Sequence, residues 1–205
     1  MDFDKLKSKI IVLNTSKALQ KNGIETLLAQ NSIEALDKIK ELIPKGASVM
    51  NGSSRTLEQI GFVDYLKGSK HGWNNLHEAI LAEKDMNKQA FLRKQCVLSD
   101  YYLGSVHALI ENGEFIIASN SGSQLPHIVF TSPNVIFVVS TKKIVPTFAE
   151  AMNRLENHVV PLEDQRMIGL YGKGTMLSKI VIFKHENPVM GRNVKMILVN
   201  EDLGF

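Results

Sequence analysis

The chain has 205 residues, of which 44% are hydrophobic and 22% are charged, and its formal net charge is +3. These values are typical of a globular protein with one domain, here residues 1–205, and they exclude a disordered or fibrous chain. Lysines are scattered, and no apolar run approaches the roughly 20 residues that span a bilayer, so we expect neither a nucleic acid nor a membrane as a partner.

The N-terminal segment indicates where the protein is located, and the cysteine content indicates which cofactors it can hold. The N-terminal segment lacks the charged-then-apolar plan of a secretion signal, which predicts a cytoplasmic protein. Cys96 is the only cysteine, so we expect no internal disulfide, no cysteine-held metal or iron-sulfur site, and no cofactor in this chain. Residues 95–98 read as the start of an interior strand, which favours a buried, inert thiol over a nucleophile.

Helices and strands alternate in the first quarter of the chain. Apolar residues at steps of three and four predict a helix over residues 4–22. Asn31 and Glu34 form a capping box for a second helix that ends before Pro44. Strands are predicted at 24–29 and 47–50, and their long connections predict parallel pairing through right-handed crossovers.

Small polar residues follow the second predicted strand. Gly52, Ser53 and Ser54 precede Arg55 and the start of a helical pattern. A loop of this kind can bind phosphate or carboxylate through its backbone N–H groups, with Arg55 as counter-charge. The alternative is that Ser54 only caps the helix.

The middle of the chain reads as a long helix over residues 76–94 followed by a buried strand at 97–99. Asp100 then lies at the carboxyl end of that strand, which is where the pocket acids of parallel sheets are found. The alternative is that Asp100 only caps a loop.

A β-hairpin is predicted from residue 106 to 117, because alternating apolar residues flank Asn112-Gly113, the dipeptide that best suits a type I′ turn. Its second arm leads into a loop of small and amide residues that can offer hydroxyls, amides and backbone N–H groups to a ligand, namely Ser119, Asn120, Ser121, Gly122, Ser123 and Gln124. Pro126 follows, so we expect a helix start there. The alternative is a solvated loop.

The last third of the chain adds three strands and a helix. Residues 135–140 are continuously apolar and β-branched, which predicts a central strand that is covered on both faces. Thr147 and Glu150 begin a helix. Two further strands are predicted at 179–184 and 193–200.

Several separated segments together resemble the LUD domain, the lactate-utilisation family. They are NGSSRTLEQIG at 51–61, LGSVHALIENGEFIIASNSGSQLP at 103–126, VIFVVSTKKIVP at 135–146 and LVNEDLGF at 198–205. The resemblance extends over essentially the whole chain. It implies the fold of the sugar-phosphate isomerase and coenzyme-A-transferase-like group, a three-layer α/β/α sandwich with a mostly parallel sheet plus a β-hairpin.

The same resemblance suggests functions. Some LUD proteins belong to lactate oxidation systems whose partner subunits carry iron-sulfur clusters, which implies an accessory or small-molecule-binding role here, since Cys96 alone cannot hold a cluster. Glu111-Asn112-Gly113 is similar to the tripeptide around the nucleophilic glutamate of class I coenzyme-A transferases. The alternative for Glu111 is an exposed turn residue.

Three hypotheses follow. The first is that the two loops bind a small anionic metabolite, such as a hydroxy acid, sugar phosphate or coenzyme-A-type ligand, with His107 and Glu111 as acid-base or nucleophilic groups if the protein is an enzyme. The second is a non-catalytic subunit that docks onto an iron-sulfur oxidoreductase. The third is acyl-coenzyme-A transfer through Glu111. Arg166 is a further residue that could reach an anion, and a homodimer is the default oligomeric state.

Overall fold

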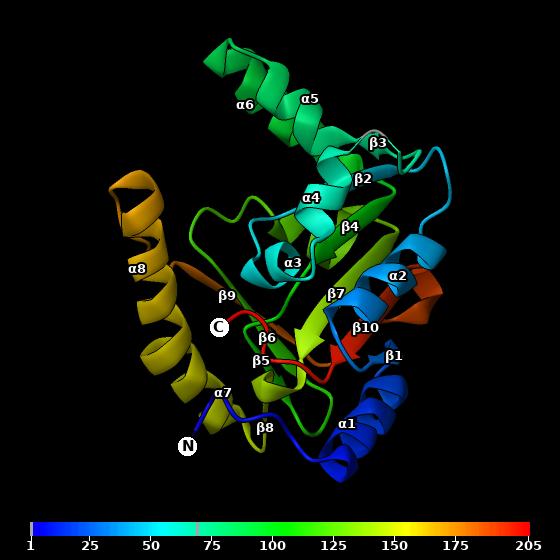
Figure 1. The fold of residues 1–205 in the computed structure, drawn as a ribbon, viewed down its shortest axis with the longest axis vertical. Coiled ribbons are helices and arrows are strands. Elements are labelled where there is room, and N and C mark those ends of the chain that lie inside the picture. Colours follow the sequence, from blue (N-terminus) through cyan, green and yellow to red (C-terminus); the bar gives the residue numbers. More distant parts are fainter. Residues whose placement is uncertain (1, 69) are drawn as a thin grey trace.

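The structure is a computed structural model that describes residues 2–68 and 70–205. Within these residues the larger sheet has the strand order β1-β10-β7-β4-β2-β3, and every neighbouring pair in it is parallel (Figure 1). Its strands are β1 (Glu25–Ala29), β2 (Ser48–Asn51), β3 (Asn74–Asn75), β4 (Tyr101–Gly104), β7 (Asn134–Ser140) and β10 (Asn193–Val199). The apolar strand β7 lies between β10 and β4, as its sequence predicts.

The predicted hairpin belongs to a second, smaller sheet. This sheet has the order β8-β5-β6-β9, in which β5 and β6 pair antiparallel. Its strands are β5 (Ala108–Ile110), β6 (Phe115–Ser119), β8 (Ile144–Val145) and β9 (Lys179–Phe183). Every residue of β5 and β6 is buried, because both faces of the hairpin are covered.

Helices flank the sheets and enclose three hydrophobic clusters. One face of the larger sheet packs against α2 (Ser32–Leu42), α3 (Arg55–Gln59) and α4 (Phe62–Lys67). The opposite face packs against α1 (Lys9–Lys21) and the smaller sheet. The outer face of the smaller sheet is covered by α7 (Phe148–Arg154) and by η4 (Leu155–Val159), a π-helical turn that continues into α8 (Val160–Tyr171). The predicted α/β/α arrangement around a mostly parallel sheet is confirmed (Figure 1).

The N-terminal helix is shorter than predicted. Helix α1 begins at Lys9 rather than near residue 4, because Ser8 caps it and its Oγ accepts from the Ile11 N–H at 3.5 Å. The preceding segment instead packs across the protein, where the carboxylate of Asp4 pairs with Lys142 Nζ at 3.0 Å.

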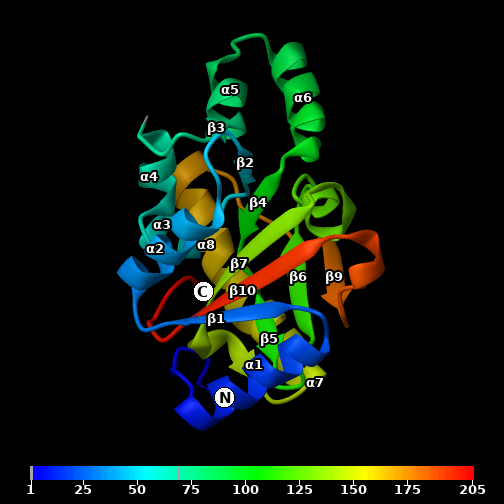
Figure 2. The same cartoon turned by 90° about the vertical axis from the view of Figure 1, so that its right-hand side faces the viewer.

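The single helix predicted over residues 76–94 is wrong, because the structure has two. Helix α5 (Leu76–Ala82) ends before a short connection, and α6 (Met86–Gln95) begins where the Asp85 carboxylate accepts from the N–H groups of Asn87 (2.9 Å) and Lys88 (3.0 Å). The pair projects from the body of the protein (Figure 2). No residue of α6 is buried, and Phe91 on it is 61% exposed.

The strand predicted at 97–99 is also wrong. Residues Cys96–Leu98 form a 3-10 turn that continues from α6, and the next strand, β4, begins at Tyr101. Asp100 therefore lies at the amino end of a strand, where its carboxylate accepts from the N–H (2.8 Å) and hydroxyl (2.7 Å) of Ser48. Cys96 is buried, as predicted, and burial raises the pKa of its thiol.

The hairpin turn is not of the predicted type I′, because Asn112 does not take a positive φ. The Gly113 N–H donates to the Ile110 carbonyl at 2.8 Å, and only Gly113 is left-handed, at φ +85°. This geometry is that of a three-residue hairpin loop closed by a glycine bulge. The turn rests on α1, where a Cβ at Gly113 would lie 2.7 Å from the Ala18 carbonyl carbon and 2.8 Å from the Leu19 nitrogen.

Among the described residues, no helix has both the length and the apolar character that a bilayer crossing requires.

Candidate functional site

A cavity of about 540 Å³ lies where the carboxyl ends of β2, β4 and β6 meet η4 and α8. Both predicted loops line it. The first loop contributes Gly52, Ser53, Ser54 and Arg55, and the second contributes Asn120, Ser121, Ser123 and Gln124. Gly122 belongs to the second loop but turns at φ +86° against the side chain of Lys179 rather than lining the cavity.

The two loops lie side by side although about seventy residues separate them in the chain. A Cβ at Gly52 would lie 3.7 Å from the Cβ of Gln124, and 2.5 Å from the hydroxyl of Tyr102. Ser119 shapes the second loop, because its Oγ accepts from the Gly122 N–H and donates to Gln124 Oε1, both at 2.8 Å. The predicted proximity of the two small-residue segments is therefore present in the structure, with a shared cavity beside them.

Ser54 has the capping role that was the alternative reading. Its Oγ accepts from the Leu57 N–H at 3.3 Å and begins α3, while the residue also lines the cavity. Arg55 is half-exposed at the cavity edge, and its guanidinium pairs with Glu58 at 3.2 Å. The positive charge of Arg55 is thus already compensated by a neighbour on its own helix.

The predicted helix start after the second loop is a single π-helical turn, η2 (His127–Thr131). Five residues do not build up the aligned dipoles of a longer helix, so an anion gains little from this element. Any backbone donors on this side of the cavity must come from the loop itself, where the N–H groups of Gly122 and Ser123 already donate to Ser119 and Ser121.

Arg166 joins α8 to the first loop. Its Nη2 donates to Ser53 Oγ at 2.9 Å, and its Nη1 lies 3.5 Å from Glu58 Oε1. Two further bonds to Glu163, from Nε (2.7 Å) and Nη2 (2.8 Å), fix the guanidinium, and hydrogen bonding to Glu163 raises the pKa of Arg166. Arg166 therefore crosses the cavity as a bridge between its two walls.

Lys143 is the site residue that the sequence reading missed. It is 4% exposed and lines the cavity, and its Nζ donates to Thr56 Oγ1 (3.1 Å), Ser105 Oγ (3.2 Å) and the Val106 carbonyl (3.2 Å). All three partners are neutral, and among the described residues no carboxylate lies within ion-pair distance of it. Burial lowers the pKa of Lys143 well below its ordinary value, and the charges of nearby Arg154 and Lys142 act in the same direction.

Lys142, the residue before Lys143, differs from it in having carboxylate partners. Lys142 is equally buried, but its Nζ pairs with Asp4 at 3.0 Å and with Asp202 at 2.6 Å. Two adjacent lysines were visible in the sequence as STKKIVP, directly before the apolar Ile144 and Val145, and both are buried. Lysines are rarely buried unless they are paired, so the unpaired one on the cavity wall is the unusual member.

His107 lines the cavity beside these groups. Its Nδ1 accepts from the Ala118 N–H at 3.0 Å, so a neutral ring carries its proton on Nε2. Burial lowers the pKa of His107 to about 3, and the charges of Lys143 and Arg154 contribute. His107 is therefore a neutral hydrogen-bond donor at physiological pH.

Comparison with known proteins places the chain in a family. A model of the LUD domain matches residues 13–171, which is most of the chain. The chain belongs to the LUD domain family. The LUD-domain protein is also similar to the crystal structure of a DUF162 family protein from Deinococcus radiodurans, with a TM-score of 0.59 and 12% identity over 96% of this chain and 100% of that one. At this identity the likeness shows the fold alone, and comparison with curated proteins found no match.

Glu111 does not line the cavity with the other predicted site residues of the LUD-domain protein. It lies in the turn between β5 and β6, where its N–H donates to the Val145 carbonyl at 2.9 Å, and it is not part of the cavity wall. The third hypothesis, acyl transfer through Glu111, requires this carboxylate in the pocket. The position of Glu111 therefore gives that hypothesis no support.

Metal chemistry also lacks a ligand set in the part of the LUD-domain protein that the structure describes. No group of three or more histidine, cysteine, aspartate or glutamate side chains comes together there in a way that could hold a metal ion. The donors at the cavity are instead hydroxyls, amides, backbone N–H groups and cationic side chains, which is a set that suits an anion.

Proposed function

We propose that this LUD-domain protein binds a small anionic metabolite in the cavity, through a carboxylate or phosphate group. The observation that carries the proposal is Lys143, a lysine that is 4% exposed, lies on the cavity wall and has only neutral hydrogen-bond partners. Leaving a buried charge uncompensated costs several kcal/mol. A bound anion would supply the missing charge.

The charges around the cavity favour the same ligand class. Arg55, Lys143 and Arg166 line the cavity, whereas Glu163 is the acidic side chain that lines it, and Glu163 is already paired with Arg166. The proposed anion would therefore place a negative charge beside Lys143, which has no carboxylate partner among the described residues. Charge-assisted hydrogen bonds to an anionic oxygen are about twice as strong as neutral ones.

The loops and His107 would complete the binding site. The small Ser53 and Ser54 leave room for a ligand beside the first loop, where a backbone N–H would suit an anionic oxygen, whereas the Gly52 N–H is already bonded to the Tyr102 hydroxyl. His107 would donate from Nε2 to the ligand, because its Nδ1 is engaged by Ala118. Binding, rather than a defined reaction, is the activity that these contacts support.

A thermal-shift panel tests the proposal. We expect at least one hydroxy acid, sugar phosphate or coenzyme-A ester to raise the Tm by about 5–10 °C at a hundredfold excess over its Kd. Each anion is paired with a neutral analogue of the same size, such as the amide of the acid. If no anion shifts the Tm, or if each neutral analogue shifts it equally, the proposal is wrong.

A further inference from the structure

The size of the cavity bears on which anions it takes. Its volume of about 540 Å³ falls within the roughly 300–1,000 Å³ of sites that enclose drug-sized ligands. A short hydroxy acid or a lone phosphate would leave most of this space to water. The cavity thus has room for a ligand body beyond its anionic group.

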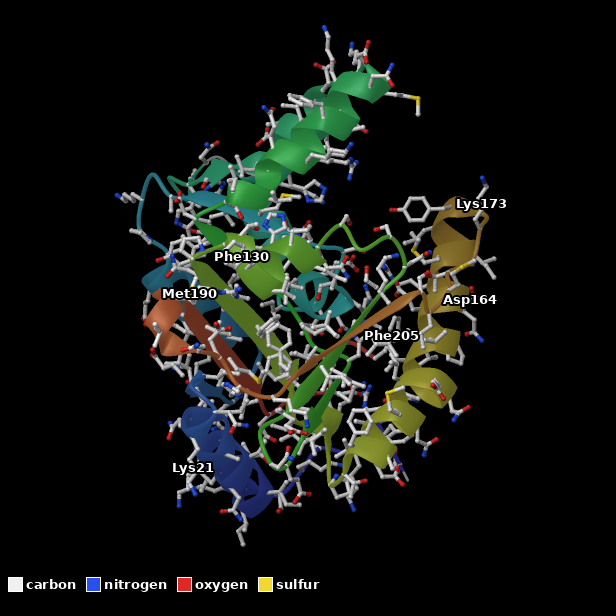
Figure 3. The ribbon with its side chains drawn as sticks, turned by 180° about the vertical axis from the view of Figure 1, so that it is seen from behind. Lys21, Phe130, Asp164, Lys173, Met190 and Phe205 are labelled. Carbon is white, nitrogen blue, oxygen red and sulfur yellow. The ribbon has the colours of Figure 1, made fainter. Side chains whose placement is uncertain are left out.

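Apolar side chains form much of the wall opposite the loops, which also carries the ion pair of Arg166 with Glu163. The apolar side chains belong to η4, to α8 and to the segment that follows α8, namely Leu155, Val159, Val160, Met167, Met176 and Leu177. The cavity is lined by residues of both α3 and α8, which stand apart in Figure 1, and Figure 3 shows Phe205, another lining residue, between α8 and the sheets. An apolar wall of this extent favours a ligand that has apolar surface to bury.

Helix α8 itself lacks the packing expected of a covering helix. Such a helix normally buries an apolar stripe against the core, yet no residue of α8 is buried. Val160 and Met167 line the cavity and are each partly exposed, and Val160 also packs against the hydrophobic cluster beneath the smaller sheet. On α8, Met167 is therefore the apolar side chain that a ligand in the cavity could cover, since Val160 already packs against the cluster under the smaller sheet.

The polar groups gather at a different part of the cavity wall. Lys143 Nζ bonds to Thr56 and Ser105, next to the first loop. The two walls are joined where Arg166 of α8 reaches Ser53. One part of the cavity wall is thus cationic and rich in hydrogen-bond donors, and another is apolar.

We infer that the ligand is an amphiphilic anion, in which an anionic group bound near Lys143 is joined to an apolar chain that packs against α8. The inference rests on the proposed function and goes beyond it by naming the ligand class. The apolar chain would bury Met167 and its neighbours, and it would supply the packing that α8 lacks.

A series of carboxylates of increasing chain length tests whether the cavity binds an apolar chain. Straight-chain monocarboxylates from acetate to octanoate are titrated into the protein by isothermal calorimetry. Each added methylene that is buried strengthens binding about fourfold. We therefore expect the affinity to rise by about that factor per methylene until the cavity is filled.

Two neighbouring residues give a matched pair of variants. Met167→Gln places a polar group on the cavity wall and is expected to flatten the dependence of affinity on chain length. Ile168→Gln is the control, because Ile168 is 51% exposed and does not line the cavity, and it should keep the wild-type series.

The outcomes separate the two proposals. Equal binding of short and long carboxylates, or a chain-length dependence that survives Met167→Gln, overturns the amphiphilic ligand while anion binding stands. Failure of every carboxylate and of every anion in the thermal-shift panel overturns both.

Discussion

Replacing Lys143 by methionine is expected to weaken the binding of an anionic ligand at least tenfold and to remove its thermal shift. Hydrogen bonds to charged groups contribute about 1.5–3 kcal/mol, and about 1.4 kcal/mol corresponds to a factor of ten. Methionine keeps much of the length of the side chain and leaves no unpaired buried charge, so we expect the Tm without ligand to be unchanged or higher. Thermal-shift and calorimetric titrations of wild type and variant measure both quantities.

The adjacent lysine provides the control. Lys142 has the same exposure of 4%, but it is paired with Asp4 and Asp202 and does not line the cavity. Lys142→Met should therefore keep the response to anions. If Lys143→Met binds anions as tightly as wild type, or if Lys142→Met loses as much affinity as Lys143→Met, then Lys143 does not bind the anion.

The pKa of Lys143 adds a second signature. Burial lowers this pKa in the free protein, whereas a bound anion stabilises the ammonium form and raises it again. Binding therefore takes up a proton at any pH between the two values, and affinity falls as the pH rises through that window. Calorimetry in two buffers with different ionisation enthalpies detects the proton, and Lys143→Met should abolish it.

Replacing Gly113 by alanine is expected to destabilise the protein by about 2–3 kcal/mol. The backbone at Gly113 is left-handed, and an added Cβ would lie 2.7 Å from the Ala18 carbonyl carbon and 2.8 Å from the Leu19 nitrogen. Both contacts are backbone atoms of α1, so they cannot move aside as a flexible side chain would. Urea denaturation gives the free energy of unfolding.

Gly46→Ala separates the cost of a left-handed alanine from the cost of the close contact with α1. Gly46 has nearly the same φ, +84°, but no atom lies within 4 Å of an added Cβ. This variant carries only the conformational cost, about 1 kcal/mol. An equal loss of stability in the two variants would mean that the contact between the hairpin turn and α1 contributes nothing.

Local signals account for the parts of the fold that the sequence predicts correctly. Asn31 Oδ1 accepts from the Glu34 N–H at 3.0 Å, and Thr147 Oγ1 accepts from the Glu150 N–H at 3.2 Å, so both predicted caps are present. The central strand β7 was visible as a continuous apolar run. The errors arose where short-range patterns compete, as at Asp85, whose capping carboxylate divides an otherwise continuous helical pattern.

The site could be predicted only in part, because its members come from distant segments. The two loops were found from their composition, which is a local property. The bonds of Lys143 to Ser105 and Thr56 join residues 38 and 87 positions apart, and the bond from Arg166 to Ser53 spans 113 positions. No pattern within one segment reveals such pairs, and the apolar wall on α8 looks in sequence like an ordinary core-facing stripe.

A crystal structure of the protein with the anion that gives the largest thermal shift would show where the ligand lies. We expect its anionic oxygens within hydrogen-bond distance of the loop at Gly52–Ser54, with Lys143 Nζ turned toward them and the second loop at Asn120–Gln124 closing the other side. An anion bound elsewhere on the surface, with the cavity still holding only water, would contradict the proposed site.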